Sequence, residues 1–79
     1  MRFTLAQLEA LHWVARLGSV RAAASHLHLT QPAVSVRLRE LEAGVGGPLI
    51  QRDSYRATPT PLGREIASHA ERILAACDG

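Results

Sequence analysis

The sequence predicts a mainly α-helical fold: a winged helix-turn-helix of three helices plus a short β-wing, followed by a further helix. Three observations predict it. Two short amphipathic segments joined by a tight turn lie within 20–39, each preceded by a residue suited to cap a helix. Two short extended segments around a polar turn follow within 48–59. A helical stripe of apolar residues then runs through 60–79.

The second helix of the pair is expected to begin near Gln31. Thr30 can cap it, because a threonine hydroxyl accepts from an otherwise unpaired backbone N–H, and Pro32 stands in the first turn, where a missing donor does little harm. On a helical wheel the apolar inner positions are Val34, Leu38, Leu41 and Val45, and the opposite positions are Pro32, Ser35, Val36 and Arg39. One face can therefore pack while the other is free to read a partner.

The first helix of the pair is expected to follow Ser19, which can serve as its N-cap. Its inner positions are mostly small, and alanine has little bulk to keep a crossing helix away. These positions are Val20, Ala23, Ala24 and Leu27. The pair can therefore cross closely, as a helix-turn-helix requires.

A further helix is expected ahead of the pair. Thr4 and Gln7 form a capping-box pattern, and the helix should span about fourteen residues up to Gly18. Trp13 falls beside its apolar stripe and is expected at the edge of the core, with a subunit contact as the alternative. The stripe consists of Leu8, Leu11, Val14 and Ala15.

A β-wing is expected after the helix pair. The run 46–48 (Gly-Gly-Pro) ends the helix, and 49–52 then reads as a strand, 53–55 as a polar turn and 56–58 as the returning strand. Pro59 must lie at an edge or an end, since it cannot donate to a ladder. The wing arginines, Arg52 and Arg56, can reach a phosphate backbone or a minor groove, although a plain solvated hairpin is the alternative.

The last helix is expected to start with Thr60 as cap and Pro61 at its first position. Part of its apolar stripe should pack against the same helix of a second subunit in a two-fold homodimer. Intrachain packing on the first helix is the alternative, and both can hold. Because the helix lacks a clear end signal, we expect it to continue in a longer parent protein. The stripe consists of Leu62, Ile66, His69, Ala70, Ile73 and Cys77.

Composition points to a single small domain with a nucleic-acid partner. A chain of 79 residues is too short for a multidomain enzyme, and all nine of its basic residues are arginine, giving a net charge of +2. Arg21, Arg37 and Arg39 lie in a stretch, 19–39, that contains no acid. Positive potential is thus concentrated at the helix pair, as phosphate contact requires, and double-stranded DNA is the leading partner. The alternative interpretation is that these arginines are ordinary, scattered surface residues.

Several other classes of function find little support. The single cysteine forbids an intrachain disulfide and fits a reducing cytoplasm, and no segment has the length of a membrane span or the form of a secretory signal. His26 and His28 are poor metal-ligand candidates, because no cysteine or carboxylate cluster accompanies them. His12 and His69 are each isolated and read as packing or surface residues. No catalytic motif and no cofactor are expected.

Taken in order, these features make the chain resemble the N-terminal domain of LysR-type transcriptional regulators over essentially its whole length. The resemblance implies a winged helix-turn-helix that dimerises through a long linker helix. It also implies a ligand-sensing domain, absent here, through which a small-molecule effector would act in the full regulator. The residues that carry the resemblance are Leu8, Leu11, Val14, Ala15, Gly18, Ser19, Ala23, Ala24, Leu27, His28, Thr30, Gln31, Pro32, Ala33, Val34, Ser35, Leu38, Leu41, Glu42, Gly46, Pro48, Leu49, Arg52, Arg56, Thr60, Gly63, Arg72, Ile73 and Leu74.

The resemblance also implies roles for individual residues. Residues like Gln31, Pro32 and Ser35 face bases or phosphates in that family, and the arginine at position 52 supports the wing. The chain departs from the family at Val20, Arg21 and Val36, where Phe, a hydroxyl residue and often Arg are usual. Valine at position 36 can still touch a thymine methyl group. Ile50 and Pro59, for the usual Phe and Leu, imply a slightly smaller wing core.

These inferences predict a DNA-binding domain over 1–59 and a truncated linker helix over 60–79. The helix from Gln31 to Ala43 should enter a major groove, with Gln31 positioned for adenine, and the operator should be an interrupted inverted repeat. The alternatives are a helix-turn-helix module of a recombinase or transposase and a winged helix that binds protein. The predicted DNA-binding residues are Ser19, Arg21, Thr30, Gln31, Pro32, Ala33, Ser35, Val36, Arg39, Arg52 and Arg56.

Overall fold

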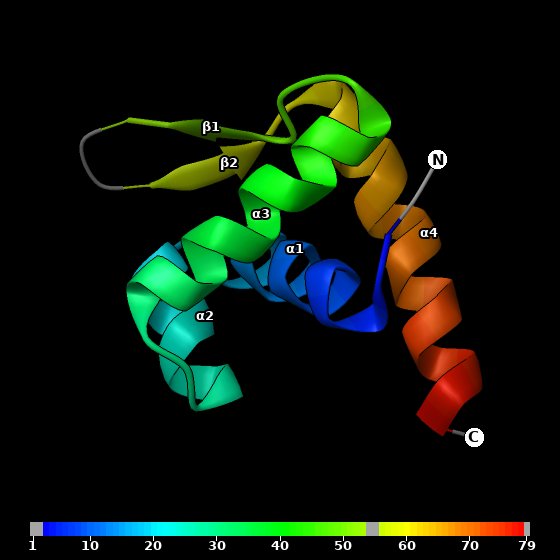
Figure 1. The fold of residues 1–79 in the computed structure, drawn as a ribbon, viewed down its shortest axis with the longest axis horizontal. Coiled ribbons are helices and arrows are strands. Elements are labelled where there is room, and N and C mark those ends of the chain that lie inside the picture. Colours follow the sequence, from blue (N-terminus) through cyan, green and yellow to red (C-terminus); the bar gives the residue numbers. More distant parts are fainter. Residues whose placement is uncertain (1–2, 54–55, 79) are drawn as a thin grey trace.

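The structure, a computed structural model, describes residues 3–53 and 56–78 of the chain (Figure 1). It confirms the mainly α-helical winged helix-turn-helix fold. Ser54 and Tyr55 of the predicted polar turn lie outside the described residues. In chain order the elements are α1 (Leu5–Leu17), α2 (Val20–Leu27), α3 (Gln31–Val45), β1 (Ile50–Arg52), β2 (Ala57–Pro59) and α4 (Pro61–Asp78).

The first three helices begin where their cap residues predict. The Thr4 hydroxyl accepts from the backbone N–H of Gln7 at 3.1 Å, and the Gln7 side chain accepts in return from the Thr4 N–H at 3.1 Å, which completes the capping box. Ser19 accepts from the Ala22 N–H at 3.1 Å to start α2. Each hydroxyl or amide replaces a partner that the first helical turn cannot supply.

Left-handed residues end the same three helices. Gly18 ends α1 with φ 70° and Gly46 ends α3 with φ 88°, in a region that glycine enters without steric cost. His28 ends α2 with φ 58°, and it is the non-glycine residue with positive φ in the described part of the chain. This residue opens the turn of the helix-turn-helix, and the next amide, Leu29 N–H, donates to the Ala24 carbonyl at 2.8 Å.

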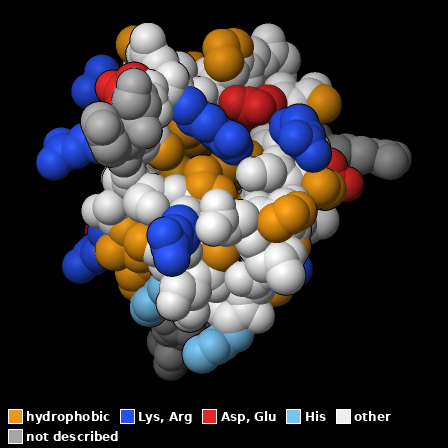
Figure 2. All heavy atoms as spheres, turned by 90° about the vertical axis from the view of Figure 1, so that its left-hand side faces the viewer, with side chains coloured by type: hydrophobic (Ala, Val, Ile, Leu, Met, Phe, Trp, Pro, Cys, Tyr) orange, Lys and Arg blue, Asp and Glu red, His pale blue; other side chains and the backbone are white. Residues whose placement is uncertain are grey.

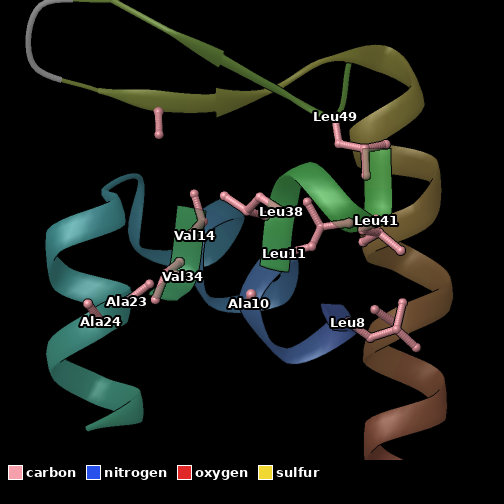
Figure 3. Close-up of a cluster of buried hydrophobic side chains, with 12 residues drawn as sticks. Leu8, Ala10, Leu11, Val14, Ala23, Ala24, Val34, Leu38, Leu41 and Leu49 are labelled. Atoms are coloured by element: carbon pink, nitrogen blue, oxygen red, sulfur yellow. The ribbon is translucent and has the colours of Figure 1, made fainter. Parts of the chain in front are cut away.

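The core forms around α1, which packs against α2, α3 and α4 (Figure 1). Figure 3 shows apolar side chains from these elements directed toward one another, and no polar side chain is buried among the described residues. Ala23 and Ala24 are buried where α2 meets its neighbours, as expected. Ala10 is also fully buried, although it was not among the expected stripe of α1, and Ala15 of that stripe is only half-buried.

The wing is a two-stranded antiparallel ribbon in which Ile50 pairs with Pro59 and Arg52 with Ala57. Both expected strands were misplaced by one residue at their start. Leu49 does not join the ladder, because its N–H donates to the Glu42 carboxylate at 2.8 Å and its carbonyl accepts from the Thr60 N–H at 3.0 Å. The expected return strand 56–58 is shifted to 57–59, with Pro59 as its last residue.

The wing is attached to the helix-turn-helix as well as to α4. The Ala57 N–H donates to the Gly18 carbonyl at 3.0 Å, which joins β2 to the turn between α1 and α2. Leu49, held between α3 and the start of α4, is fully buried. Both ends of the ribbon are therefore fixed by hydrogen bonds to the helical core.

The cap of α4 confirms the predicted start of the last helix. The Thr60 hydroxyl accepts from the Gly63 N–H at 2.9 Å and donates to the Pro48 carbonyl at 2.7 Å, and Pro61 is the first helical residue. One hydroxyl thus starts α4 and holds the loop that leads into the wing.

The apolar stripe of α4 packs largely on its own chain. Leu62, Ile66 and Ile73 are partly buried against the core, and Ala70 is 0% exposed. The intrachain alternative accounts for these residues, and Ala70 offers no surface to a second subunit. His69 and Cys77, the other members of the expected dimer stripe, are exposed.

Trp13 and three histidines make side-chain contacts that the sequence did not predict. Trp13 packs at the edge of the core as predicted, but the His26 ring of α2 stacks on it with centroids 3.7 Å apart. His12 contacts the same ring edge-on at 4.9 Å, and Arg72 Nη2 lies 3.0 Å from His69 Nδ1. His12 thus contacts its sequence neighbour on α1, and His69 contacts a residue one helical turn further along α4.

Candidate nucleic-acid interface

The outer face of α3 carries most of the predicted contact residues. Gln31, Pro32, Val36 and Arg39 are exposed, whereas Ser35 is half-buried at the side that faces the wing. Ala33 is also half-buried. The helix keeps its inner side for the core, where Val34, Leu38 and Leu41 are almost completely buried. The exposed positions are therefore available to a partner without disturbing the fold.

Four predicted residues from three elements line one shallow hollow. This hollow, of about 290 Å³, lies between the start of α2, the start of α3 and the two wing strands. Helix N-termini carry partial positive charge and unpaired N–H groups, so two of them beside two arginines favour phosphate. The lining also contains Asp53, whose carboxylate accepts from the Arg56 N–H. The predicted residues in the lining are Ser19, Gln31, Arg52 and Arg56.

Arg52 links the wing to α3. Its Nη2 donates to the Ser35 hydroxyl at 3.3 Å, which spans the space between β1 and α3. A second hollow of about 340 Å³ places Arg39 and Arg52 in one lining. The guanidinium carries five N–H donors in a planar fork, so a single bond to Ser35 leaves donors for a phosphate.

The two capping hydroxyls can serve the helix and a ligand together. Ser19 and Thr30 each accept one backbone N–H, from Ala22 and from Ala33 at 3.2 Å. A hydroxyl that accepts still has its own proton to donate. Both side chains can therefore donate to a phosphate oxygen without uncapping α2 or α3.

The charge distribution on this side of the molecule is mainly positive (Figure 2). Arginine side chains are spread across the face that Figure 2 shows, around patches of hydrophobic side chains. Two of the acids close to the candidate interface are engaged by the protein: Glu42 accepts from Leu49, and Asp53 accepts from the Arg56 N–H at 3.1 Å. Arg21 is exposed on α2 but lines neither hollow.

Two residues that shape the interface were missed at the level of sequence. Glu42 fixes the start of the wing through Leu49, seven positions away, and the Gly18 carbonyl holds β2. Both residues are among those that carry the family resemblance, but nothing in the sequence assigned either of them a hydrogen bond to the wing. No local pattern indicates a hydrogen bond between elements.

Neither a metal site nor a membrane-spanning helix is found in residues 3–53 and 56–78, the described parts of the chain. Within these ranges no group of three or more His, Cys, Asp and Glu side chains can hold a metal ion. Over the same residues no helix has both the length and the apolar character needed to cross a membrane.

Similarity to known proteins decides the family. Residues 5–64 match the family model of bacterial regulatory helix-turn-helix proteins of the lysR family. The chain belongs to the LysR family. The HTH-type transcriptional regulator CfxR of Cupriavidus necator is 46% identical over 71 residues, which cover 90% of this chain and 22% of that protein. A probable RuBisCO transcriptional regulator of Emiliania huxleyi is 38% identical over 76 residues, covering 96% of this chain and 24% of that protein.

Solved structures of LysR-type proteins have the same fold. Corynebacterium glutamicum OxyR in its oxidized form superimposes with a TM-score of 0.94 at 35% identity, covering 99% of this chain and 25% of that one. The CbnR DNA-binding domain in complex with DNA gives 0.90 at 32% identity, covering 96% of this chain and 87% of that one. The BenM DNA-binding domain with catB site 1 DNA also gives 0.90, at 29% identity, over 96% and 84%.

These similarities establish the class of the LysR-type chain. It is a helix-turn-helix DNA-binding domain of the transcriptional-regulator class, and this class is not one of enzymes. The chain spans about a quarter of the length of the curated relatives it matches.

Proposed function

We propose that this LysR-type domain binds a double-stranded operator in sequence-specific fashion, with α3 in the major groove and the wing over the flanking minor groove. The hollow shared by Ser19, Gln31, Arg52 and Arg56 carries the proposal, because it joins two helix N-termini to the arginines of the wing. The DNA complexes of the similar CbnR and BenM domains support it.

The proposed contacts divide into base reading and phosphate binding. Gln31 is exposed at the start of α3, and its amide can make a bidentate pair with adenine. Ser19, Arg21, Thr30 and Arg39 would bind phosphates, which fix the orientation of the helix but carry no sequence information. The complete proposed set is Ser19, Arg21, Thr30, Gln31, Pro32, Ala33, Ser35, Val36, Arg39, Arg52 and Arg56.

The proposed assembly is a two-fold dimer in the cytoplasm. Residues 1–59 form the DNA-binding unit, and 60–79 act as a linker helix whose remaining exposed surface, including His69 and Cys77, meets the second subunit. Two recognition helices related by a two-fold axis would bind half-sites about one helical turn, or a multiple of it, apart. The operator is then an interrupted inverted repeat, and a small-molecule effector would act through the rest of the parent protein.

The direct test is a titration of the chain against random duplexes at two salt concentrations, followed by sequencing of the bound fraction. We expect salt-sensitive binding and an enriched interrupted inverted repeat, because phosphate contacts release counterions and base contacts select sequence. Enrichment of a single half-site would contradict the proposed dimer but not sequence-specific binding. Absence of both enrichment and salt-sensitive binding would contradict the proposed function.

Replacing Gln31 by alanine is expected to relax the preference at one base pair of each half-site. Loss of a bidentate base contact costs about 1–3 kcal/mol. The measurement is a repeated selection with the variant. Gln51→Ala, an exposed glutamine on β1, serves as the matched control and should leave that base pair as selective as before. An unchanged consensus for Gln31→Ala would remove this residue from base reading.

Replacing Arg52 by alanine is expected to weaken binding to every duplex and to lower the slope of log affinity against log salt by about one. The reason is the loss of a phosphate contact and of the bond that holds the wing to Ser35. Affinities at several salt concentrations measure the slope. Arg64→Ala, on the exposed side of α4, should leave the slope unchanged, and an unchanged slope for Arg52→Ala would exclude its phosphate role.

A further inference from the structure

The recognition helix has an apolar centre on its outer face. Val36 is 43% exposed, which makes it the large hydrophobic side chain left open to solvent on α3, a fully described helix. At about 100° per residue, Val36 points away from the buried Val34, Leu38 and Leu41. Pro32 and Ala43, one and two turns away, are exposed on the same side. The outer face of α3 therefore carries an apolar strip of exposed side chains, bordered on one side by the exposed Arg39 and on the other by the exposed Glu40.

Polar groups lie on both sides of this strip, Glu40 on one side and Ser35 and Arg39 on the other. Ser35 is bonded to Arg52 of the wing, and Arg39 shares a hollow with the same arginine, so both belong to the side of α3 next to β1. Gln31 lies at the helix start beside the other hollow. Side chains at these positions can bind phosphates and hydrogen-bonding base edges, whereas Val36 can contact an apolar partner.

The floor of the major groove offers one apolar group at the base edges. Every base pair presents hydrogen-bond donors or acceptors at its edge in this groove. Thymine presents an apolar 5-methyl group as well. Valine suits such a contact, because its branched Cβ restricts it to one main rotamer in a helix and fixes the direction of both methyl groups before binding. Exposed valine would have no such partner along a phosphate backbone.

We propose that Val36 is a specificity-determining residue that reads the 5-methyl group of a pyrimidine in each half-site. This inference rests on the proposed function, since it requires α3 to lie in the major groove. It goes beyond that function by naming the chemical group that is read. The site should accept thymine, discriminate against uracil and cytosine, and recover affinity for cytosine when that base carries a 5-methyl group.

The test uses the duplex enriched by the chain itself, in which each thymine is replaced singly by deoxyuridine, so that only the methyl group is lost. The wild-type chain is expected to bind one of these duplexes about fourfold more weakly per half-site, the effect of one buried methyl group. Val36→Ala should bind the thymine and deoxyuridine duplexes equally. Leu5→Ala, at a side chain that is 49% exposed on α1, is the control and should keep the wild-type ratio.

A second arm replaces the same thymine-adenine pair by cytosine-guanine, with and without a 5-methyl group. The methyl group should strengthen wild-type binding by about the same factor and leave Val36→Ala unaffected. Equal affinity of the wild type for all deoxyuridine duplexes would overturn the inference while leaving sequence-specific binding intact. A ratio that persists in Val36→Ala would overturn it as well, since another side chain would then read the methyl group. Failure of the initial enrichment would instead overturn the proposed function, and the inference with it.

Discussion

Replacing Gly63 by alanine is expected to destabilise the domain, although alanine is the better helix former by about 1 kcal/mol. Gly63 lies in the first turn of α4, and a Cβ atom there would overlap the backbone carbonyl of Leu49. Backbone cannot rotate away as a side chain can. The expected net loss is about 1–3 kcal/mol in the free energy of unfolding, the usual range for overpacking. Because Leu49 starts the wing, affinity for DNA should fall as well.

Gly47 provides a matched control for this prediction. A Cβ atom at Gly47 would approach the end of the Leu62 side chain at 3.1 Å, and a leucine methyl group can move by a few tenths of an ångström. Urea unfolding of both variants measures the difference. Gly47→Ala should stay within about 1 kcal/mol of the wild type. If Gly63→Ala were as stable as the wild type, the close approach of α4 to the wing would be wrong.

Replacing Leu41 by alanine is expected to lower the free energy of unfolding by about 2–5 kcal/mol, the usual range for truncating a buried leucine. Leu41 on α3 is 0% exposed and belongs to the cluster that joins α3 to α1 and α4. Domains of this kind have a total stability of about 5–15 kcal/mol, so the variant should be marginally folded at best. Because only folded protein binds, the apparent DNA affinity of the variant should fall with the folded fraction. It should recover when the sample is cooled toward room temperature.

Leu17→Ala is the matched control, since Leu17 is 42% exposed on α1. It should change the free energy of unfolding by no more than about 0.5 kcal/mol. Thermal and urea unfolding, followed by circular dichroism, measure both variants. Equal midpoints for the two would contradict the placement of Leu41 in the core.

The helix starts could be predicted from the sequence because caps are local. Thr4, Ser19 and Thr30 each bond an amide three residues ahead, so the signal and its effect lie within one turn. The same locality made the inner face of α3 predictable, since helical periodicity alone selects Val34 and Leu38. The wing and its arginines were likewise predicted from local composition, and the resemblance to the LysR-type family added roles for individual residues.

The remaining features depend on contacts between distant segments. Leu49 lies outside β1 because its backbone N–H and carbonyl are bonded to Glu42 and Thr60. Neither partner can be recognised from the composition of the strand itself. The stripe of α4 could serve either a second subunit or α1, and periodicity does not distinguish two apolar partners. The stacking of His26 on Trp13 likewise follows from how α2 crosses α1. Of the candidate site, residue types and exposure were predictable, whereas the bond between Arg52 and Ser35 was not.

The attachment of the wing has a consequence for the DNA. The distance between α3 and the wing is set within the protein by the bonds from Ala57 to Gly18, Arg52 to Ser35 and Leu49 to Glu42. A duplex whose groove width does not match this spacing must itself bend or twist, and the free energy of that deformation depends on base-stacking steps that no side chain touches. Indirect readout of flexible or narrow-grooved sequence beneath the wing should therefore contribute to operator choice alongside the direct contacts of α3.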